Sequence, residues 1–175
     1  MTIVIFVIIV TAKEMLVINM KILFLDIDGV LNFGGCKDRA PSGCIGISDE
    51  KLSLLKEIVS KTNAKIVLVS TWKFGWEKTN KADMVSDCIY MEEKFKEHGL
   101  SIYDKTYDRG FNRGQGIRDY LFDTEDFIDS WIVIDDEVFV DYKENQVIDR
   151  LVKTSFYNDG LLECHVKEAI KKLEV

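Results

Sequence analysis

The sequence predicts an α/β fold in which a parallel sheet lies between two layers of helices. Three apolar runs, at residues 20–25, 64–73 and 131–137, are typical of strands that are buried on both faces. Segments with helical spacing of apolar residues alternate with these runs, which favours strand–helix–strand units and parallel pairing. We therefore expect one three-layer domain over residues 20–175, without a large cap domain.

Composition limits the class of protein. With 175 residues, of which 47% are hydrophobic and 30% charged, the chain has the make-up of one globular domain that can bury a core. The 23 basic and 30 acidic residues give a net charge of −7, so the overall charge indicates neither a nucleic-acid partner nor an anionic membrane. A negative net charge still allows a local groove of basic residues.

The four cysteines are spread through the chain: Cys36, Cys44, Cys88 and Cys164. None belongs to a C-x-x-C pair that would indicate zinc. We interpret them as free thiols in a reducing compartment and expect a cytoplasmic location. A disulfide between Cys36 and Cys44 is the alternative.

The first 19 residues need a separate interpretation. Residues 2–10 are apolar and β-branched, whereas a bilayer span needs about 20 such residues. No basic segment precedes them and no small-residue cleavage pattern follows, so we expect an extra strand rather than a signal peptide, and no membrane partner. Translation that begins at Met15 or Met20 is a further alternative, because the pattern from Met20 onward already starts a domain.

Two aspartates stand where the first strand ends. Asp26 and Asp28 follow the apolar run, and Gly29 permits a sharp exit from the strand. Ligands of open α/β sheets bind at the carboxyl ends of strands, and two close carboxylates favour a hard cation such as Mg²⁺. An acidic turn without a site is the alternative, because aspartate and glycine are common turn residues.

The next segment is expected to be irregular and then helical. Residues 33–47 are rich in glycine and polar residues, which predicts a loop that either screens the strand end or simply connects surface elements. Ser48 is typical of an N-cap, and acidic residues follow it in the first turn. Apolar residues at helical spacing then predict a helix that ends near residue 62 or 63.

The second strand is expected to end in hydroxyl groups. A right-handed strand–helix–strand unit places its two strands side by side, so Ser70 and Thr71 should arrive next to Asp26. Turn formation is the alternative role for Ser70. Residues 74–112 are polar with one predicted helix at 81–98, a segment too short for a large cap, so we expect a mostly open site.

A basic residue and a second acidic strand end follow. Arg113 precedes a predicted helix, whose free N–H groups favour anions, and is therefore suited to phosphate; an exposed surface arginine is the alternative. The third apolar run ends in Asp135 and Asp136. We expect a last strand at 150–155 and a C-terminal helix after 158–160, and we assign no role to His165 on that helix.

This order of motifs is similar to that of the haloacid dehalogenase (HAD) superfamily, whose domains are Rossmann-like. The segments that carry the resemblance are L-D-I-D-G-V-L-N, V-S-T-W-K, a basic residue at a helix start, I-D-D-E, and a late D-G-L. Within the superfamily they resemble small capless domains, including a group found in RNA-repair proteins. The resemblance covers Met20 to the C-terminus.

The resemblance implies roles at the first two strand ends. Asp26 would be the nucleophile that forms an aspartyl-phosphate, and Asp28 would protonate the leaving oxygen and later activate water. Ser70 would hydrogen-bond a phosphoryl oxygen, with Thr71 as the alternate, and Gly29 would lie against the phosphate.

The resemblance also implies a Mg²⁺ site. The ligands would be Asp26, the main-chain carbonyl of Asp28, and one of the two later acids. We favour Asp136 as the direct ligand, with Asp135 behind it.

The sequence departs from the superfamily at the third motif, which usually carries lysine. Arg113 stands at the expected helix start, while Lys73 lies just past the second strand, and either could supply the cation. We favour Arg113, whose guanidinium offers phosphate a bidentate fork.

We therefore expect a Mg²⁺-dependent phosphohydrolase that acts on a phosphorylated small molecule, a nucleotide or a polynucleotide end; the oligomeric state stays open. The first alternative is an inactive domain that binds metal and a phosphorylated ligand. The second is a signalling receiver domain, which carries its phospho-accepting aspartate on a middle strand. We expect the strand that ends in Ser70 to occupy that place, which disfavours a receiver.

Overall fold

The computed structural model describes residues 20–108, 111–125 and 127–174. The extra strand that we predict within residues 1–19 lies outside the described residues, as do the alternative interpretations of that segment.

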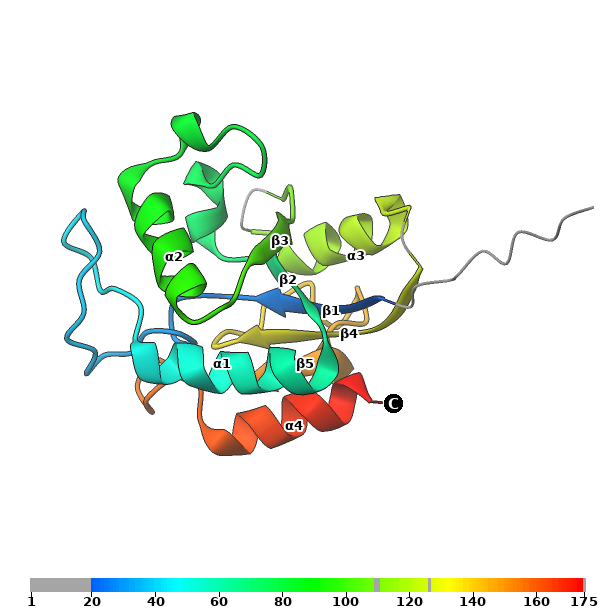
Figure 1. Cartoon of the computed structure of the whole chain (residues 1–175). Helices are drawn as coiled ribbons and strands as arrows, with labels where there is room; N and C mark the ends of the chain where they lie inside the picture. The colour runs from blue at the N-terminus through cyan, green and yellow to red at the C-terminus, as the bar shows by residue number, and fades with distance from the viewer. Residues whose placement is uncertain (1–19, 109–110, 126, 175) are drawn as a thin grey trace, which may run out of the picture.

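Five parallel strands form one sheet in the order β3-β2-β1-β4-β5. Their bounds are β1 Met20–Leu25, β2 Lys65–Leu68, β3 Ile102–Lys105, β4 Ile128–Asp135 and β5 Leu151–Lys153. The α/β class and the parallel pairing of the three predicted strands are confirmed. The central strand is β1 rather than β2 (Figure 1), so our placement of the Ser70 strand in the middle of the sheet was wrong.

The helices make the two outer layers of the fold. Their bounds are α1 Asp49–Thr62, α2 Ser86–Glu97, α3 Arg113–Asp123 and α4 Glu163–Leu173, with short 3₁₀ helices η1 Thr71–Gly75, η2 Lys81–Asp83 and η3 Ile148–Arg150. Helices α1 and α4 lie side by side below the sheet as drawn in Figure 1, and α3 lies above it. This arrangement is the predicted three-layer architecture.

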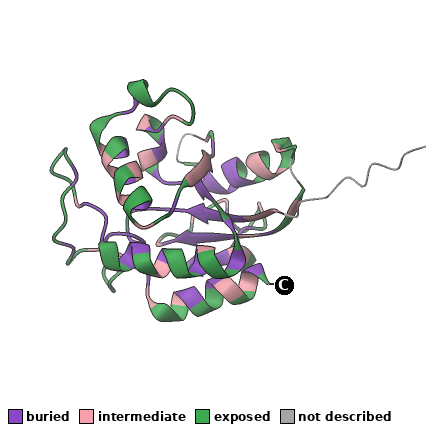
Figure 2. Cartoon of the chain, in the orientation of Figure 1, coloured by how far each residue is buried: buried purple, intermediate pink, exposed green. Residues whose placement is uncertain are grey.

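Alternation along the central strand explains why both faces of the sheet are covered. Leu23 and Leu25 belong to the core under α1 and α4, whereas Ile22 and Phe24 pack on the side of α3. All four side chains are fully buried, and Figure 2 shows the central strands mostly in purple, the colour of buried residues. Because β1 buries apolar side chains on both faces of the sheet, the strand is held firmly in the core. The carboxyl end of β1 therefore has a fixed position.

Several predicted boundaries were wrong, each for a local reason. Strand β2 ends at Leu68 and not at residue 73, because the Ser70 carbonyl accepts a hydrogen bond from Lys73 N at 3.0 Å and starts η1. Helix α2 begins at Ser86 and not at residue 81, because the Asn80 side chain bonds that of Asp83 and closes a separate 3₁₀ turn.

The third predicted strand begins earlier and ends earlier than expected. Ile128 pairs with Met20, and the strand stops at Asp135, whose carboxylate accepts a hydrogen bond from Glu137 N and turns the chain.

The segment between β2 and β3 contains only η1, η2 and α2, in agreement with the predicted lack of a large cap domain. Within the described residues, none of the helices combines the length and the apolar character that a bilayer span requires. The four cysteines are unpaired, with Cys36 and Cys88 buried and Cys44 and Cys164 exposed.

Candidate active site

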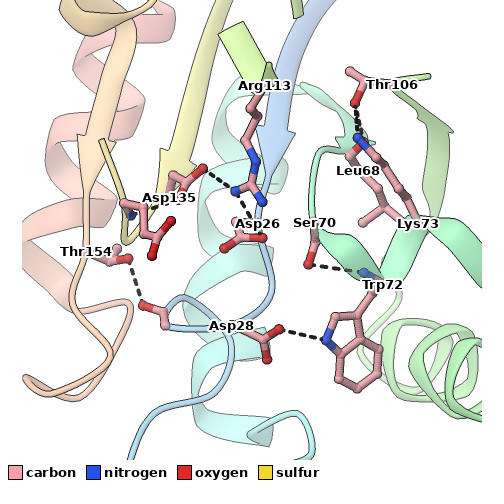
Figure 3. A network of polar contacts seen from close by, with 12 residues as sticks. Asp26, Asp28, Leu68, Ser70, Trp72, Lys73, Thr106, Arg113, Asp135 and Thr154 are labelled. Carbon is pink, nitrogen blue, oxygen red and sulfur yellow. Dashed lines mark hydrogen bonds and ion pairs between the residues drawn. The ribbon is translucent and has the colours of Figure 1, made fainter. Parts of the chain in front are cut away.

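Asp26 lies at the centre of a cluster of polar side chains at the carboxyl edge of the sheet. It directly follows β1, and its main-chain N–H donates to the carbonyl of Ile134 at 3.0 Å, which continues the ladder to β4. Its side chain is only 7% exposed. Figure 3 shows it between Arg113 and Ser70, so the two strands and the helix predicted to meet at this edge do meet.

A tight turn carries the chain away from Asp26. Gly29 has φ +73°, a left-handed conformation that favours glycine, and its N–H donates to Asn32 Oδ1 at 3.0 Å. Its carbonyl accepts from Thr154 Oγ1 at 2.8 Å, which joins the turn to the end of β5. A Cβ at this position would lie 2.2 Å from the carboxyl carbon of Asp136, so glycine lets the two strand ends approach closely.

Asp28 is exposed, unlike Asp26, and each of its oxygens is held by a donor. Asn32 Nδ2 donates to Oδ1 at 2.7 Å, and the indole Nε1 of Trp72 donates to Oδ2 at 3.1 Å. Trp72 sits in η1, just beyond the end of β2, so the second strand orients the second aspartate. The carboxyl group is thereby fixed at the mouth of the site.

The acids after β4 differ sharply in their surroundings. Asp135 is fully buried, and its Oδ2 accepts from Arg113 Nη1 at 2.6 Å and from the Tyr142 hydroxyl at 2.8 Å. Asp136 is half-buried, and burial together with the charge of Asp135 raises its pKa. The inner acid is thus held by Arg113 and Tyr142 in the interior, whereas the outer acid lies nearer the surface of the site.

Arg113 is the first residue of α3 and contacts the two inner carboxylates, those of Asp26 and Asp135. Its Nη1 is 2.6 Å from Asp135 Oδ2 and 3.4 Å from Asp26 Oδ1, and its guanidinium stacks 4.2 Å from the ring of Phe139. Burial lowers the pKa of Arg113, but the charges of Asp26 and Asp135 outweigh this and raise it above its usual value. The arginine is therefore a permanent buried cation.

Lys73, the competing cation, points elsewhere. Its Nζ donates to Asp108 Oδ1 at 2.6 Å and to Thr106 Oγ1 at 2.9 Å, both just beyond the end of β3. Burial lowers the pKa of Lys73, and the hydrogen bond to Asp108 partly offsets this. Figure 3 shows the side chain directed to Thr106 rather than to the carboxylates.

The two hydroxyl residues after β2 are separated in space. Ser70 is fully buried beside Asp26, and its hydroxyl also accepts a hydrogen bond from Trp72 N at 3.5 Å. Thr71 is exposed and lines a neighbouring cavity. The structure thus brings Ser70 to the carboxylates and leaves Thr71 at their periphery.

Burial dominates the electrostatics of Asp26. It raises the pKa of Asp26 to about 7, with Arg113 opposing the shift, Asp135 adding to it, and the Ser70 hydrogen bond opposing it. The guanidinium is closer to Asp135 than to Asp26, so it compensates the buried charge of Asp26 only in part. A second positive charge at this edge would favour the ionised carboxylate.

This shift predicts how stability depends on pH in the metal-free protein. The folded state keeps a proton on Asp26 that the unfolded chain, with the ordinary pKa of 3.8, releases. The resulting stabilisation is complete below pH 3.8 and is lost as pH rises through about 7. The free energy of unfolding is measured by urea titration in EDTA at each pH. Across this window it should fall more steeply with pH in wild type than in D26N, by up to about 1.4 kcal/mol per pH unit. Parallel profiles for the two proteins would contradict the shift.

The donor set fits a hard divalent cation. Asp26, Asp135 and Asp136 each offer a carboxylate oxygen, and these oxygens lie within 4.8 Å of one another. Carboxylate oxygens with retained waters are the ligands that Mg²⁺ prefers. Arg113 contacts two of these three carboxylates, those of Asp26 and Asp135, so a bound cation would relieve the repulsion that remains among the three.

The close approach of Gly29 to Asp136 gives a second prediction. G29A should displace the Asp136 carboxylate and weaken Mg²⁺ binding by about 10-fold or more, as disturbed supporting contacts do at metal sites. G43A is the matched control, because Gly43 also has positive φ (+88°) but nothing within 4 Å of its Cβ position. The left-handed backbone should cost each variant about 1–2 kcal/mol of stability, and the displacement of Asp136 adds to this cost in G29A. Calorimetric titration with Mg²⁺ separates them, and equal affinities would contradict the prediction.

Four further residues that shape the site had no role in the sequence interpretation: Asn32, Trp72, Tyr142 and Thr154. Asn32 and Trp72 stand within the motif segments L-D-I-D-G-V-L-N and V-S-T-W-K, so proximity to the motifs was a usable signal for them. Tyr142 lies in a loop and Thr154 at the end of the last strand, and nothing in their local sequence indicates the contacts that they make.

Comparison with known proteins identifies related domains. A family model described as the HAD domain in Swiss Army Knife RNA repair proteins matches residues 22–166. Among solved structures, a Legionella pneumophila protein assigned to subfamily III A of the HAD superfamily hydrolases is 14% identical, with 89% of this chain and 86% of that chain covered at a TM-score of 0.41. No curated protein sequence matches the chain at a significant level.

Proposed function

Because the chain belongs to the family of HAD domains of Swiss Army Knife RNA repair proteins, we propose that it is a Mg²⁺-dependent phosphohydrolase. The observation that carries the proposal is the contrast between two aspartates on one turn. Asp26 is buried beside a cation and a hydroxyl, whereas Asp28 is exposed and held by two donors. The first environment suits a nucleophile in a fixed position, and the second suits an acid and base that exchanges protons with substrate and water.

In the first step, an Asp26 carboxylate oxygen attacks phosphorus and the bond from phosphorus to the leaving oxygen breaks. Asp28 transfers its proton to that leaving oxygen, which departs as an alcohol, and Asp26 becomes an aspartyl-phosphate. Asn32 and Trp72 hold Asp28 at the mouth of the site, so the proton is delivered from the solvent side.

In the second step, the Asp28 carboxylate accepts a proton from water, and the water oxygen attacks phosphorus. The bond from phosphorus to the Asp26 oxygen breaks, inorganic phosphate leaves, and both carboxyl groups return to their starting states. The same residue thus acts as acid and then as base, which requires a carboxyl group that solvent can reach.

The metal would be held by Asp26, the main-chain carbonyl of Asp28 and Asp136. Its contribution when bound is to neutralise negative charge on the transferring phosphoryl group. Asp135 supports the site from behind, because its Oδ2 is already engaged by Arg113 and Tyr142.

Arg113 fills the third motif in this proposal, and Lys73 does not. Of these two cations, Arg113 is the one that contacts Asp26 and Asp135. Lys73 instead pairs with Asp108, just beyond the end of β3. The atom of Arg113 that faces Asp26 is Nη1, at 3.4 Å from Oδ1, so the guanidinium is placed to support a phosphoryl group on that carboxylate. Ser70 and Gly29 would contact phosphoryl oxygens, with Thr71 further out.

The open edge of the sheet and the family support the proposed substrate class. We propose a phosphorylated small molecule, a nucleotide or a polynucleotide end, met in the cytoplasm, where four unpaired thiols are stable. The inactive alternative, a domain that binds metal and a phosphorylated ligand without turnover, predicts binding but no phosphate release. A receiver domain is set aside, because the chain belongs to a different family.

Phosphate release from a panel of substrates tests the function. Nucleotides, 3′- and 5′-phosphorylated oligonucleotides, phosphosugars and phosphopeptides are compared with Mg²⁺, with EDTA, and with Mg²⁺ restored after EDTA. Turnover should require Mg²⁺ and return with it. Uniform failure across the panel, in protein shown to be folded by circular dichroism, would contradict the proposal.

A further inference from the structure

A cavity of about 520 Å³ opens beside Asp28, on the side of Trp72, and its volume is in the range of small-molecule sites. The lining residues that matter here are Asp28, Cys44, Thr71, Trp72, Asp87 and Phe156. Asp28 lies in the turn after β1, and the others come from the 33–47 loop, the chain after β2, the start of α2 and the chain after β5. The backbone N–H of Ser42 donates to Asp87 Oδ1 at 2.9 Å, which ties the loop to α2 on one side of the cavity.

The chemistry of the proposed site indicates which part of the substrate this cavity binds. Asp28 protonates the leaving oxygen, so the leaving group must extend from the phosphoryl position past Asp28. Asp28 lines this cavity. We propose that it binds the leaving group of the substrate and that this group is a nucleoside, an inference that rests on the proposed phosphohydrolase function.

The chemistry of the walls selects a flat, uncharged group. Trp72 and Phe156 are half-buried aromatic residues that reach the cavity from segments far apart in the sequence. The hydrogen bond from Trp72 to Asp28 restrains the indole before any ligand binds, which lowers the entropic cost of stacking. Every nucleobase has a π-face that stacks on such side chains.

The charge of the walls excludes further phosphate groups. Among the described residues that line the cavity, none is lysine or arginine, whereas Asp28 and Asp87 are both acidic. A second phosphate inside the cavity would be repelled, so one neutral nucleoside fits and a polyphosphate does not. Thr71 and Asp87 supply a hydroxyl and a carboxylate for the polar edges of a base.

A thiol in the wall allows a test that does not depend on turnover. Cys44 is exposed and lines the cavity, while Cys164 is exposed at the start of α4 and serves as an internal control. Cys88 also lines the cavity, but burial raises its pKa to about 11, so it reacts slowly. Alkylation of Cys44 by iodoacetamide therefore reports on occupancy.

The full-length protein is alkylated with and without adenosine, guanosine or ribose, and modification at each cysteine is followed by mass spectrometry. Either nucleoside should slow alkylation of Cys44 about 5-fold or more at saturation and leave Cys164 unchanged, while ribose should have no effect. W72F should keep the protection because the ring remains, and W72A should lose it. Absence of protection at millimolar nucleoside in the wild type, or equal protection of both cysteines, would overturn the proposal.

Kinetics separate this proposal from the function on which it rests. The kcat/KM for adenosine monophosphates should exceed that for ribose 5-phosphate by about 10-fold or more, the range expected for one stacked base. The kcat/KM for an oligonucleotide with a terminal phosphate is measured in parallel. Comparison of the two values shows whether the nucleoside belongs to a free nucleotide or to the end of a strand. Hydrolysis without base preference and without Cys44 protection would overturn the nucleoside site alone. Cys44 protection in a protein that hydrolyses no phosphate ester would support the site and contradict the function.

Discussion

D26N is expected to lower kcat for phosphate release by about 10⁴-fold or more, the scale seen when a covalent nucleophile is removed. Asparagine has the shape of aspartate but cannot form the aspartyl-phosphate. The variant should stay folded, because burial already penalises the ionised form of Asp26 and the substitution removes that charge. Steady-state kinetics with Mg²⁺, together with urea unfolding, measure the two effects separately.

D104N is a matched control for this prediction. Asp104 lies in the edge strand β3, and its carboxylate pairs with Lys78 at 2.8 Å rather than with the site. D104N should retain kcat within a factor of about two and lose less than about 1 kcal/mol of stability, as a surface ion pair does. Similar kcat values for D26N and D104N would show that Asp26 is not the nucleophile.

R113M is expected to destabilise the fold by about 3–5 kcal/mol, because it strands two buried carboxylates without their cation. R118M is the matched control: Arg118 lies on the same helix α3 but is exposed, and its loss should cost less than about 0.5 kcal/mol. Adding D135N to R113M should recover part of the lost stability, because it removes one of the stranded charges. Equilibrium urea titrations of the wild type and the three variants give these free energies of unfolding.

Two further variants, R113K and K73M, decide between the two candidate cations. R113K keeps a charge but loses the planar fork, so it should fold better than R113M and still show a reduced kcat. K73M should lose stability through Asp108 while retaining more activity than R113K. The opposite order, with activity lost in K73M and kept in R113K, would assign the third motif to Lys73.

The parts of the fold that the sequence predicts well are those with a strong local signal. The apolar run of β1 and the helical spacing of α1 each fix an element, and handedness then fixes their neighbours. Strand β3 was missed because it has only four residues, all half-buried, at the edge of the sheet. Such a strand carries neither a continuous apolar run nor a clear alternation.

The residues of the site also fall into those that the sequence predicts and those that it does not. Motif spacing brings Asp26, Ser70 and the acids after β4 to one edge, since parallel strands end together. Spacing could not decide between Arg113 and Lys73, because both start near the edge and only the direction of each side chain separates them. Trp72 stands within a motif segment, but the contact of its indole with Asp28 could not be predicted from spacing, because η1 replaces the expected end of β2 and turns Trp72 into the site.

Trapping of the phosphoenzyme tests the central claim most directly. The protein is mixed with substrate and Mg²⁺, quenched in acid, reduced with borohydride and digested, so that an acyl-phosphate is converted to homoserine at the residue that carried it. We predict homoserine at position 26 in the wild type, and none after EDTA treatment or in D26N. Turnover with no modified aspartate at that position, or with the modification at Asp28, would contradict the account.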